Sequence, residues 1–210
     1  MKYPFTPRIF AVAAILAGLS LANSARAQET IPLEEAQKIA RKLVDATTSS
    51  GDQPLTVEVD ADKPVGLKGG EAGLIVLPDK RLTADTLANA SKTMASVAQL
   101  WTYKVNLVTN GKSVDNSKIR VVTVGEGEKS KDVQLFLVGV TKNDQGALEL
   151  VIFGQGTEAI LRAPVAKLHE AKQELPIEIS GRKNGEDSAL LTLDLPGGYT
   201  AEIAVVKAGD

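Results

Sequence analysis

Short runs in which apolar and polar residues alternate dominate the sequence from Gln53 to its end. In the run from Trp101 to Leu107, for example, the odd positions are aromatic or aliphatic and the even positions are polar. A period of two residues is the pattern of a strand with one buried face. Clusters of Gly, Asn, Asp and Pro separate the runs, as turns do. We therefore predict strands over 55–59, 73–77, 101–107, 118–124, 133–140, 147–153, 175–180, 188–195 and 199–206.

The spacing of these runs predicts the fold class. Short strands separated by compact turns are typical of all-β architectures, whereas a parallel sheet needs a crossover helix between successive strands. The sequence has few segments that could supply such helices. We therefore predict a mainly β protein in which residues 53–210 form one antiparallel β-sandwich or barrel-like domain.

Apolar residues at helical spacing occur in two segments. Between residues 30 and 48, aliphatic side chains share one face and charged side chains share the other. This pattern predicts an N-terminal amphipathic helix within a linker and helix segment, 28–52, and Pro32 suits its first turn. The second segment predicts a short helix within 83–99. Segment 156–173 fits either a short helix or a strand broken at a proline.

The first 27 residues have the three parts of a bacterial secretory signal. Lys2 and Arg8 make the start basic, Ile9 to Ala22 carries no charge, and Ala25-Arg26-Ala27 is a small-x-small cleavage site. As a helix the apolar stretch would span about 21 Å, short of the roughly 30 Å that a membrane anchor must cross. We therefore expect a signal peptide over 1–27, no membrane anchor after cleavage, and a location in the periplasm or outside the cell.

The composition excludes several kinds of chemistry. The chain has no Cys, which removes disulfides, thiol nucleophiles and thiolate metal sites. Its one imidazole, His169, stands in a charged run, which favours an exposed side chain over a buried catalytic base. The net charge is −2, and loss of residues 1–27 would remove basic residues and no acids. We therefore expect no binding to nucleic acid, and we predict no cofactor.

Two acidic turns are candidate metal sites. Asp60, Asp62 and Glu71 occupy positions 1, 3 and 12 of an EF-hand loop, but Pro64 and Val65 stand at positions 5 and 6, where an oxygen ligand and a glycine are needed. A looser calcium site at Asp60 and Asp62, or at Asn143 and Asp144, is retained as a hypothesis. The segment 154–159 fits the G-x-G-x-x-A dinucleotide fingerprint. Because a proline soon interrupts the segment that should be a helix, we interpret it as a Gly-rich turn.

The predicted strand over 133–140 is nearly apolar on both faces. Such a strand is either a central one, covered on one side by the N-terminal helix, or one that another chain covers. The first interpretation is favoured. The second makes the candidate partner surface Leu135, Phe136, Leu137 and Val138.

These features predict an exported non-enzymatic protein with a binding or structural role in the cell envelope and an unknown protein partner or small ligand. One alternative is a small-ligand or glycan-binding β-sandwich module. Its glycan form is weakened because Trp101 and Tyr103 share a strand face with aliphatic residues and so point to the core. The other alternative is a hydrolase with a carboxylate pair, and because such pairs form in space, the sequence leaves it open.

Overall fold

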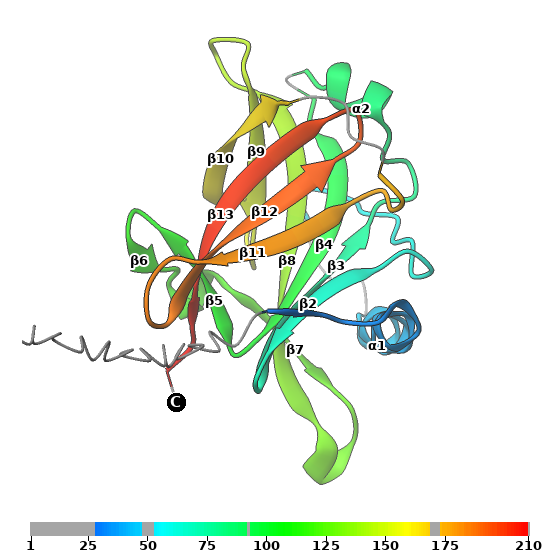
Figure 1. Cartoon of the computed structure of the whole chain (residues 1–210), viewed down its shortest axis with the longest axis vertical. Coiled ribbons are helices and arrows are strands. Elements are labelled where there is room, and N and C mark those ends of the chain that lie inside the picture. Colours follow the sequence, from blue (N-terminus) through cyan, green and yellow to red (C-terminus); the bar gives the residue numbers. More distant parts are fainter. Residues whose placement is uncertain (1–27, 48–52, 92, 169–172, 210) are drawn as a thin grey trace, which may run out of the picture.

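The computed structural model describes residues 28–47, 53–91, 93–168 and 173–209. Figure 1 shows a curled sheet with one longer helix on its outside. In chain order the elements are β1 (Glu29–Thr30), α1 (Leu33–Ala46), β2 (Val65–Gly69), β3 (Ala72–Pro78), α2 (Ala84–Ala88), β4 (Ala95–Tyr103), β5 (Val105–Thr109), β6 (Lys112–Ser113), a 3-10 turn (Asn116–Lys118), β7 (Arg120–Val124), a second 3-10 turn (Gly127–Lys129), β8 (Lys131–Lys142), β9 (Leu148–Phe153), β10 (Ala159–Lys167), β11 (Glu178–Lys183), β12 (Ser188–Leu195) and β13 (Tyr199–Lys207).

The strands form one antiparallel sheet that curls into a half-barrel (Figure 1). The order along the sheet is β1-β2-β3-β4-β8-β9-β10-β13-β12-β11, while β7 pairs with β8, and β5 pairs with β13 and β6. The two ends of this path approach each other, because β11 lies against β2. The mainly β, barrel-like fold with two helices that the sequence predicts is thereby confirmed.

Two strands that change neighbours produce the curl. The predicted single strand over 101–107 is in fact two, since Lys104 has a positive φ of 54° between β4 and β5. This corner carries the chain from the β3 side of the sheet to β13. The undecided segment after residue 156 contains the strand β10, and Pro164 lies where β10 leaves β9 and joins β13. A proline is tolerated there because pairing is already interrupted at a sheet corner.

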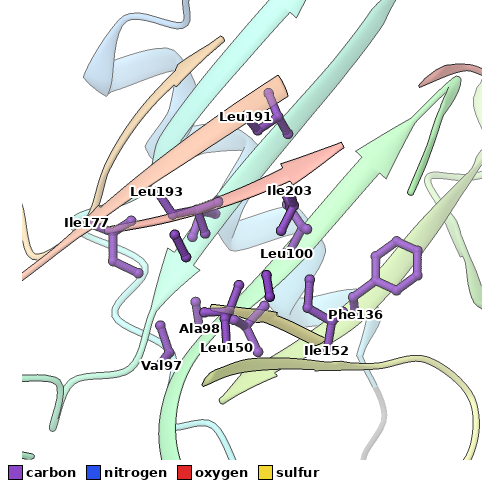
Figure 2. Packing of buried hydrophobic residues seen from close by; sticks show 14 of the residues in the cluster. Val97, Ala98, Leu100, Phe136, Leu150, Ile152, Ile177, Leu191, Leu193 and Ile203 are labelled. Atoms are coloured by element: carbon purple, nitrogen blue, oxygen red, sulfur yellow. The ribbon is translucent and has the colours of Figure 1, made fainter. Parts of the chain in front are cut away.

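The inside of the curl is filled by the main hydrophobic core. Figure 2 shows its centre, where side chains from β4, β8 and β9 meet those from β12 and β13. On β8 the even positions, such as Phe136, face this core, while Leu135 faces the outside of the sheet. The outside is covered by α1, whose small Ala36 and Ala40 allow close packing against Trp101. Both faces of the central strands are therefore buried.

One further predicted strand differs from the structure. The segment 55–59 is not a strand: apart from a single bridge at Val59, it lies as an extended cover that packs Leu55 over the outer face. The short helix predicted within 83–99 is α2, at the start of that segment, and the end of the segment belongs to β4. A register shift between Ser96 and Ala98 buries two consecutive residues there, which resembles helical spacing in the sequence.

Candidate functional site

The candidate metal residues lie in two ordinary turns. Asp60 accepts the backbone N–H of Asp62 at 3.2 Å, and the Asp62 carboxylate lies 3.5 Å from Arg41 of α1. Asn143 closes its turn by accepting two backbone N–H bonds, while Asp144 is exposed. Across the described residues, no group of three or more His, Asp or Glu side chains converges as metal ligands would. The structure therefore brings the two members of each pair together only as parts of a turn.

The candidate partner residues on β8 are buried within the fold. Leu135 packs beneath α1, Leu137 beneath the segment at Leu55, and Phe136 and Val138 point into the main core. None is more than 3% exposed. Elements of the same chain cover both faces of this strand, as expected for a central strand with the N-terminal helix on one side.

The Gly-rich segment after β9 enters β10 and no helix. A Cβ at Gly154 would overlap the backbone carbonyl oxygen of Lys118, and Gln155 donates its N–H to that oxygen at 2.8 Å. This glycine therefore permits a close backbone approach and does not cradle a phosphate. His169 lies outside the described residues.

A cavity of about 450 Å³ opens where the two ends of the curled sheet approach each other. Its floor belongs to the main core, so a ligand seated at the bottom of the cavity would contact aliphatic side chains. The volume falls within the roughly 300–1,000 Å³ typical of small-molecule sites. The floor residues are Leu67, Leu74, Val105, Ala189 and Val205.

The rim of this cavity is charged and of mixed sign. Lys68 lies 3.8 Å from Glu29. Within the described parts of the chain, no ion pair engages Lys183 or Lys207, which also line the cavity. The loop between β11 and β12 adds the carboxylates of Glu186 and Asp187 to the rim, and the Asp187 backbone carbonyl accepts the backbone N–H of Lys207 at 2.8 Å. The hairpin that carries the rim is thereby fastened to β13.

The N-terminal segment closes the seam beside the cavity. Gln28 lines the cavity, and its side chain occupies the space where a Cβ at Gly181 of β11 would lie. On the other side of the seam, Ile31 donates its N–H to Gly66 of β2 at 2.9 Å, and its side chain fills the space above that glycine. Each strand carries a glycine where the segment crosses it, because a larger side chain would hold the segment away.

Positive charges gather around Glu71 in the turn between β2 and β3. The Lys104 ammonium donates a hydrogen bond to Glu71 at 2.6 Å and lowers the pKa of this carboxyl. The charges of Lys207 and Lys131 lower it further. Lys131 also lies 4.9 Å from the centre of the Tyr103 ring, within cation–π range. This end of the barrel therefore has several cations close to the cavity.

The opposite end holds a buried carboxylate with a structural role. Asp79 is 1% exposed and accepts hydrogen bonds from the backbone and side chain of Arg81 and from the Glu58 N–H. Burial alone would raise the pKa of Asp79, but these hydrogen bonds lower it below the usual value. The arrangement fastens the extended segment before β2 to the end of β3.

Two other hollows lie elsewhere on the described structure. A wholly apolar groove of about 140 Å³ lies between α1 and the sheet, next to Trp101 and Tyr103. A wider hollow of about 520 Å³ lies beside Arg81 and Ser96 at the opposite end of β4. The first offers a ligand no polar anchor, and the second has less apolar surface than the cavity at the seam, so the cavity at the seam is the candidate site.

Sequence reasoning missed the residues of this cavity. They come from the N-terminal segment, the β2–β3 turn, β5, the β11–β12 hairpin and β13, which are far apart in the chain. The available signal was Gly181, which directly follows the predicted strand 175–180 and was assigned to a turn. It lies within β11, where a glycine marks a close approach.

Comparison with known proteins gives no relative. No protein-family model matches the chain, no curated protein matches it, and no solved structure matches it. Among the described residues, no helix combines the length and the apolar character needed to cross a membrane.

Proposed function

We propose that this chain is an exported, non-catalytic binding protein that takes a small ligand in the cavity at the seam. The observation that carries the proposal is the cavity itself, with its aliphatic floor and its charged rim. Ligand sites commonly combine an apolar lining with a few convergent polar groups. A ligand with a compact apolar body and a polar or ionic end fits this arrangement.

A binding role is favoured over hydrolysis by the state of the carboxyl groups. A carboxylate pair that hydrolyses a glycoside needs one member with a raised pKa to act as the acid. Among the described carboxyls, those with a shifted pKa are all shifted downward, namely Glu71, Asp79 and Asp115. Each has a donor that favours its charged form.

The glycan form of the binding role has less support. A sugar platform presents a flat aromatic side chain to solvent. Trp101 is 1% exposed beneath α1, Tyr199 is buried, and the Tyr103 ring carries Lys131 over its face. The seam cavity offers aliphatic residues and lysines in their place.

Fluorescence of 1-anilinonaphthalene-8-sulfonate tests the proposed site, since this probe joins an apolar ring system to an anionic group. We expect the native protein to bind the probe and Ala72→Leu, which adds bulk at the cavity wall, to weaken binding about tenfold, or ~1.4 kcal/mol. Ala95→Leu is the matched control, because Ala95 also packs against the main core but lines the hollow at the other end of β4. Equal binding by both variants would refute the site.

Export is tested separately from binding. Residues 1–27 have the pattern of a signal peptide, and we propose that cleavage after Ala27 leaves Gln28 at the edge of the cavity. Intact mass spectrometry of protein recovered from a bacterial periplasm should give the mass of residues 28–210. Recovery of the uncleaved chain from the cytoplasm alone would contradict this proposal and leave the binding test standing.

A further inference from the structure

Two lysines that line the seam cavity stand at core positions of their strands. Lys183 of β11 lies opposite Ala189 of β12, and the Ala189 side chain belongs to the main core. Lys207 of β13 lies opposite Val105 of β5, another residue of this core. Residues directly opposite each other in an antiparallel pair point to the same face of the sheet. Both lysines therefore extend from the inner face of the curl, beside the floor of the cavity.

The other charged groups at this end of the barrel are placed differently. Lys68 follows a core position of β2, so it points to the outer face, where it lies 3.8 Å from Glu29. Glu71 accepts a hydrogen bond from Lys104. The two carboxylates of the β11–β12 loop are exposed, and within the described residues no ion pair joins either of them to a lysine. An anionic group in the cavity can therefore pair with the two inner lysines without displacing one of these carboxylates.

The strand register places the two inner lysines within reach of one ligand group. Lys183, Ala189 and Val205 form one row across β11, β12 and β13, and Lys207 follows Val205 by two residues. With strands about 4.8 Å apart and a rise of about 3.4 Å per residue, the Cα atoms of the two lysines are about 12 Å apart. The long lysine side chains can span this separation, so one head group between them can contact both ammonium groups.

The lining of the cavity favours one sign and one shape of ligand. Three lysines and two carboxylates line it, which leaves a surplus of one positive charge. A group with a single negative charge balances this surplus, whereas a cation would add to it. The floor is aliphatic, and among the described lining residues none is aromatic. An aliphatic chain therefore packs well there, while a ring finds no stacking partner.

We propose that the seam cavity binds an aliphatic monocarboxylate, with its chain on the floor of the cavity and its carboxylate between Lys183 and Lys207. This inference rests on the proposed binding function and names the class of ligand for the same site. The carboxylate accepts charge-assisted hydrogen bonds from the two ammonium groups, while the chain replaces water against the aliphatic floor. Because both lysines are exposed, the head group stays near the entrance.

Isothermal titration calorimetry of the purified protein, expressed from its complete sequence, tests the sign of the head group. The three ligands are decanoate, decan-1-ol and decyltrimethylammonium, which at neutral pH carry an anionic, a neutral and a cationic head on unbranched chains of similar length. We expect decanoate to bind about tenfold more tightly than decan-1-ol, because only its head group pairs with the lysines. Decyltrimethylammonium should bind more weakly than decan-1-ol, since like charges repel.

Lys183→Gln combined with Lys207→Gln tests whether these two lysines set the preference. The ratio of the decanoate affinity to the decan-1-ol affinity should fall about tenfold in this double variant. Lys112→Gln combined with Lys118→Gln is the matched control, because it removes the same charge from two exposed lysines that do not line the cavity. The control should keep the ratio of the native protein. All four lysines are exposed, so circular dichroism should report the same fold for both double variants.

Three outcomes would overturn the proposed class of ligand. They are decanoate binding no tighter than decan-1-ol, a ratio that the Lys183 and Lys207 double variant keeps, and an equal fall of the ratio in the control. If 1-anilinonaphthalene-8-sulfonate still binds at the cavity in any of these cases, only the class of ligand is wrong. If neither this probe nor any of the three ligands binds, the proposed function fails as well.

Discussion

Replacement of the buried Asp79 by Asn tests how the extended segment before β2 is held. The carboxylate accepts four hydrogen bonds, and at Oδ1 the donors are the backbone N–H and the Nε of Arg81, at 2.8 and 3.0 Å. At Oδ2 the donors are the Glu58 N–H, at 3.1 Å, and Arg81 Nη2, at 2.9 Å. In Asp79→Asn, an amide NH₂ replaces one of these oxygens and directs its own hydrogens at the donors.

The cost of this change follows from the donors left without an acceptor. Losing an acceptor leaves a part-buried donor unsatisfied, at about 1–3 kcal/mol each, so two such losses cost roughly 3 kcal/mol. For a protein of this length, that corresponds to a fall in Tm of about 6–12 °C. Asp62→Asn is the matched control, because the Asp62 side chain is 76% exposed and its contact with Arg41 is at the surface. Asp62→Asn should change the free energy of unfolding by no more than about 0.5 kcal/mol.

The pH dependence supplies an independent check of the same reasoning. The pKa of Asp79 is lower in the folded chain than its ordinary value of 3.8, so the folded state binds fewer protons there than the unfolded state between these two values. The stability that the carboxylate contributes is therefore complete above pH 3.8 and is lost as the pH falls through the folded pKa. The native protein and Asp79→Asn should therefore differ less in their free energy of unfolding as the pH falls from 3.8 to the folded pKa of Asp79. Calorimetry that finds a Tm fall under about 2 °C at neutral pH, or a constant difference down to pH 2, would refute the reasoning.

Three further experiments test the packing of the sheet. Ala40→Leu should destabilise the protein by about 1–3 kcal/mol in urea unfolding, since Ala40 is fully buried between α1 and the sheet and a larger side chain overpacks that contact. Trp101 should emit at short wavelength and resist quenching by acrylamide, and emission typical of water would place it at the surface. Gly154→Ala should lower Tm because its Cβ overlaps the Lys118 carbonyl, whereas Gly156→Ala, whose nearest neighbour is 4.0 Å away, should have little effect.

The period-two pattern predicted the strands well where one face meets the core and the other meets solvent. β12 is the clearest example, with alternating burial along all of its eight residues. The pattern was less informative where a strand bends or shifts register, because each such place changes which residues are buried. At Lys104 one predicted strand became two, and at the bulge before Ala98 a strand resembled a helix.

The candidate site could not be predicted from the sequence in the same way. Its floor is made of aliphatic residues that look like any core positions, and the cavity exists only because the two ends of the sheet approach without pairing. Closure depends on Gln28 and Ile31 crossing Gly181 and Gly66, which are contacts between distant segments. Local periodicity contains no information about such contacts.

The N-terminal segment that contains Gln28 and Ile31 connects the stability of the fold with the proposed site. A chain without Cys cannot join the ends of a half-barrel through a disulfide, so their approach depends on backbone pairing and side-chain packing. β1 pairs with β2 at only two positions, Glu29 with Lys68 and Thr30 with Leu67, and short pairings at chain ends open at low free-energy cost. Because Gln28 and Lys68 also line the cavity, opening this segment would widen the entrance while the main core stays intact. Hydrogen exchange should therefore be faster at the amides of Thr30 and Ile31 than at that of Leu191 in β12. When a ligand occupies the cavity, exchange at Thr30 and Ile31 should be slower than in the free protein.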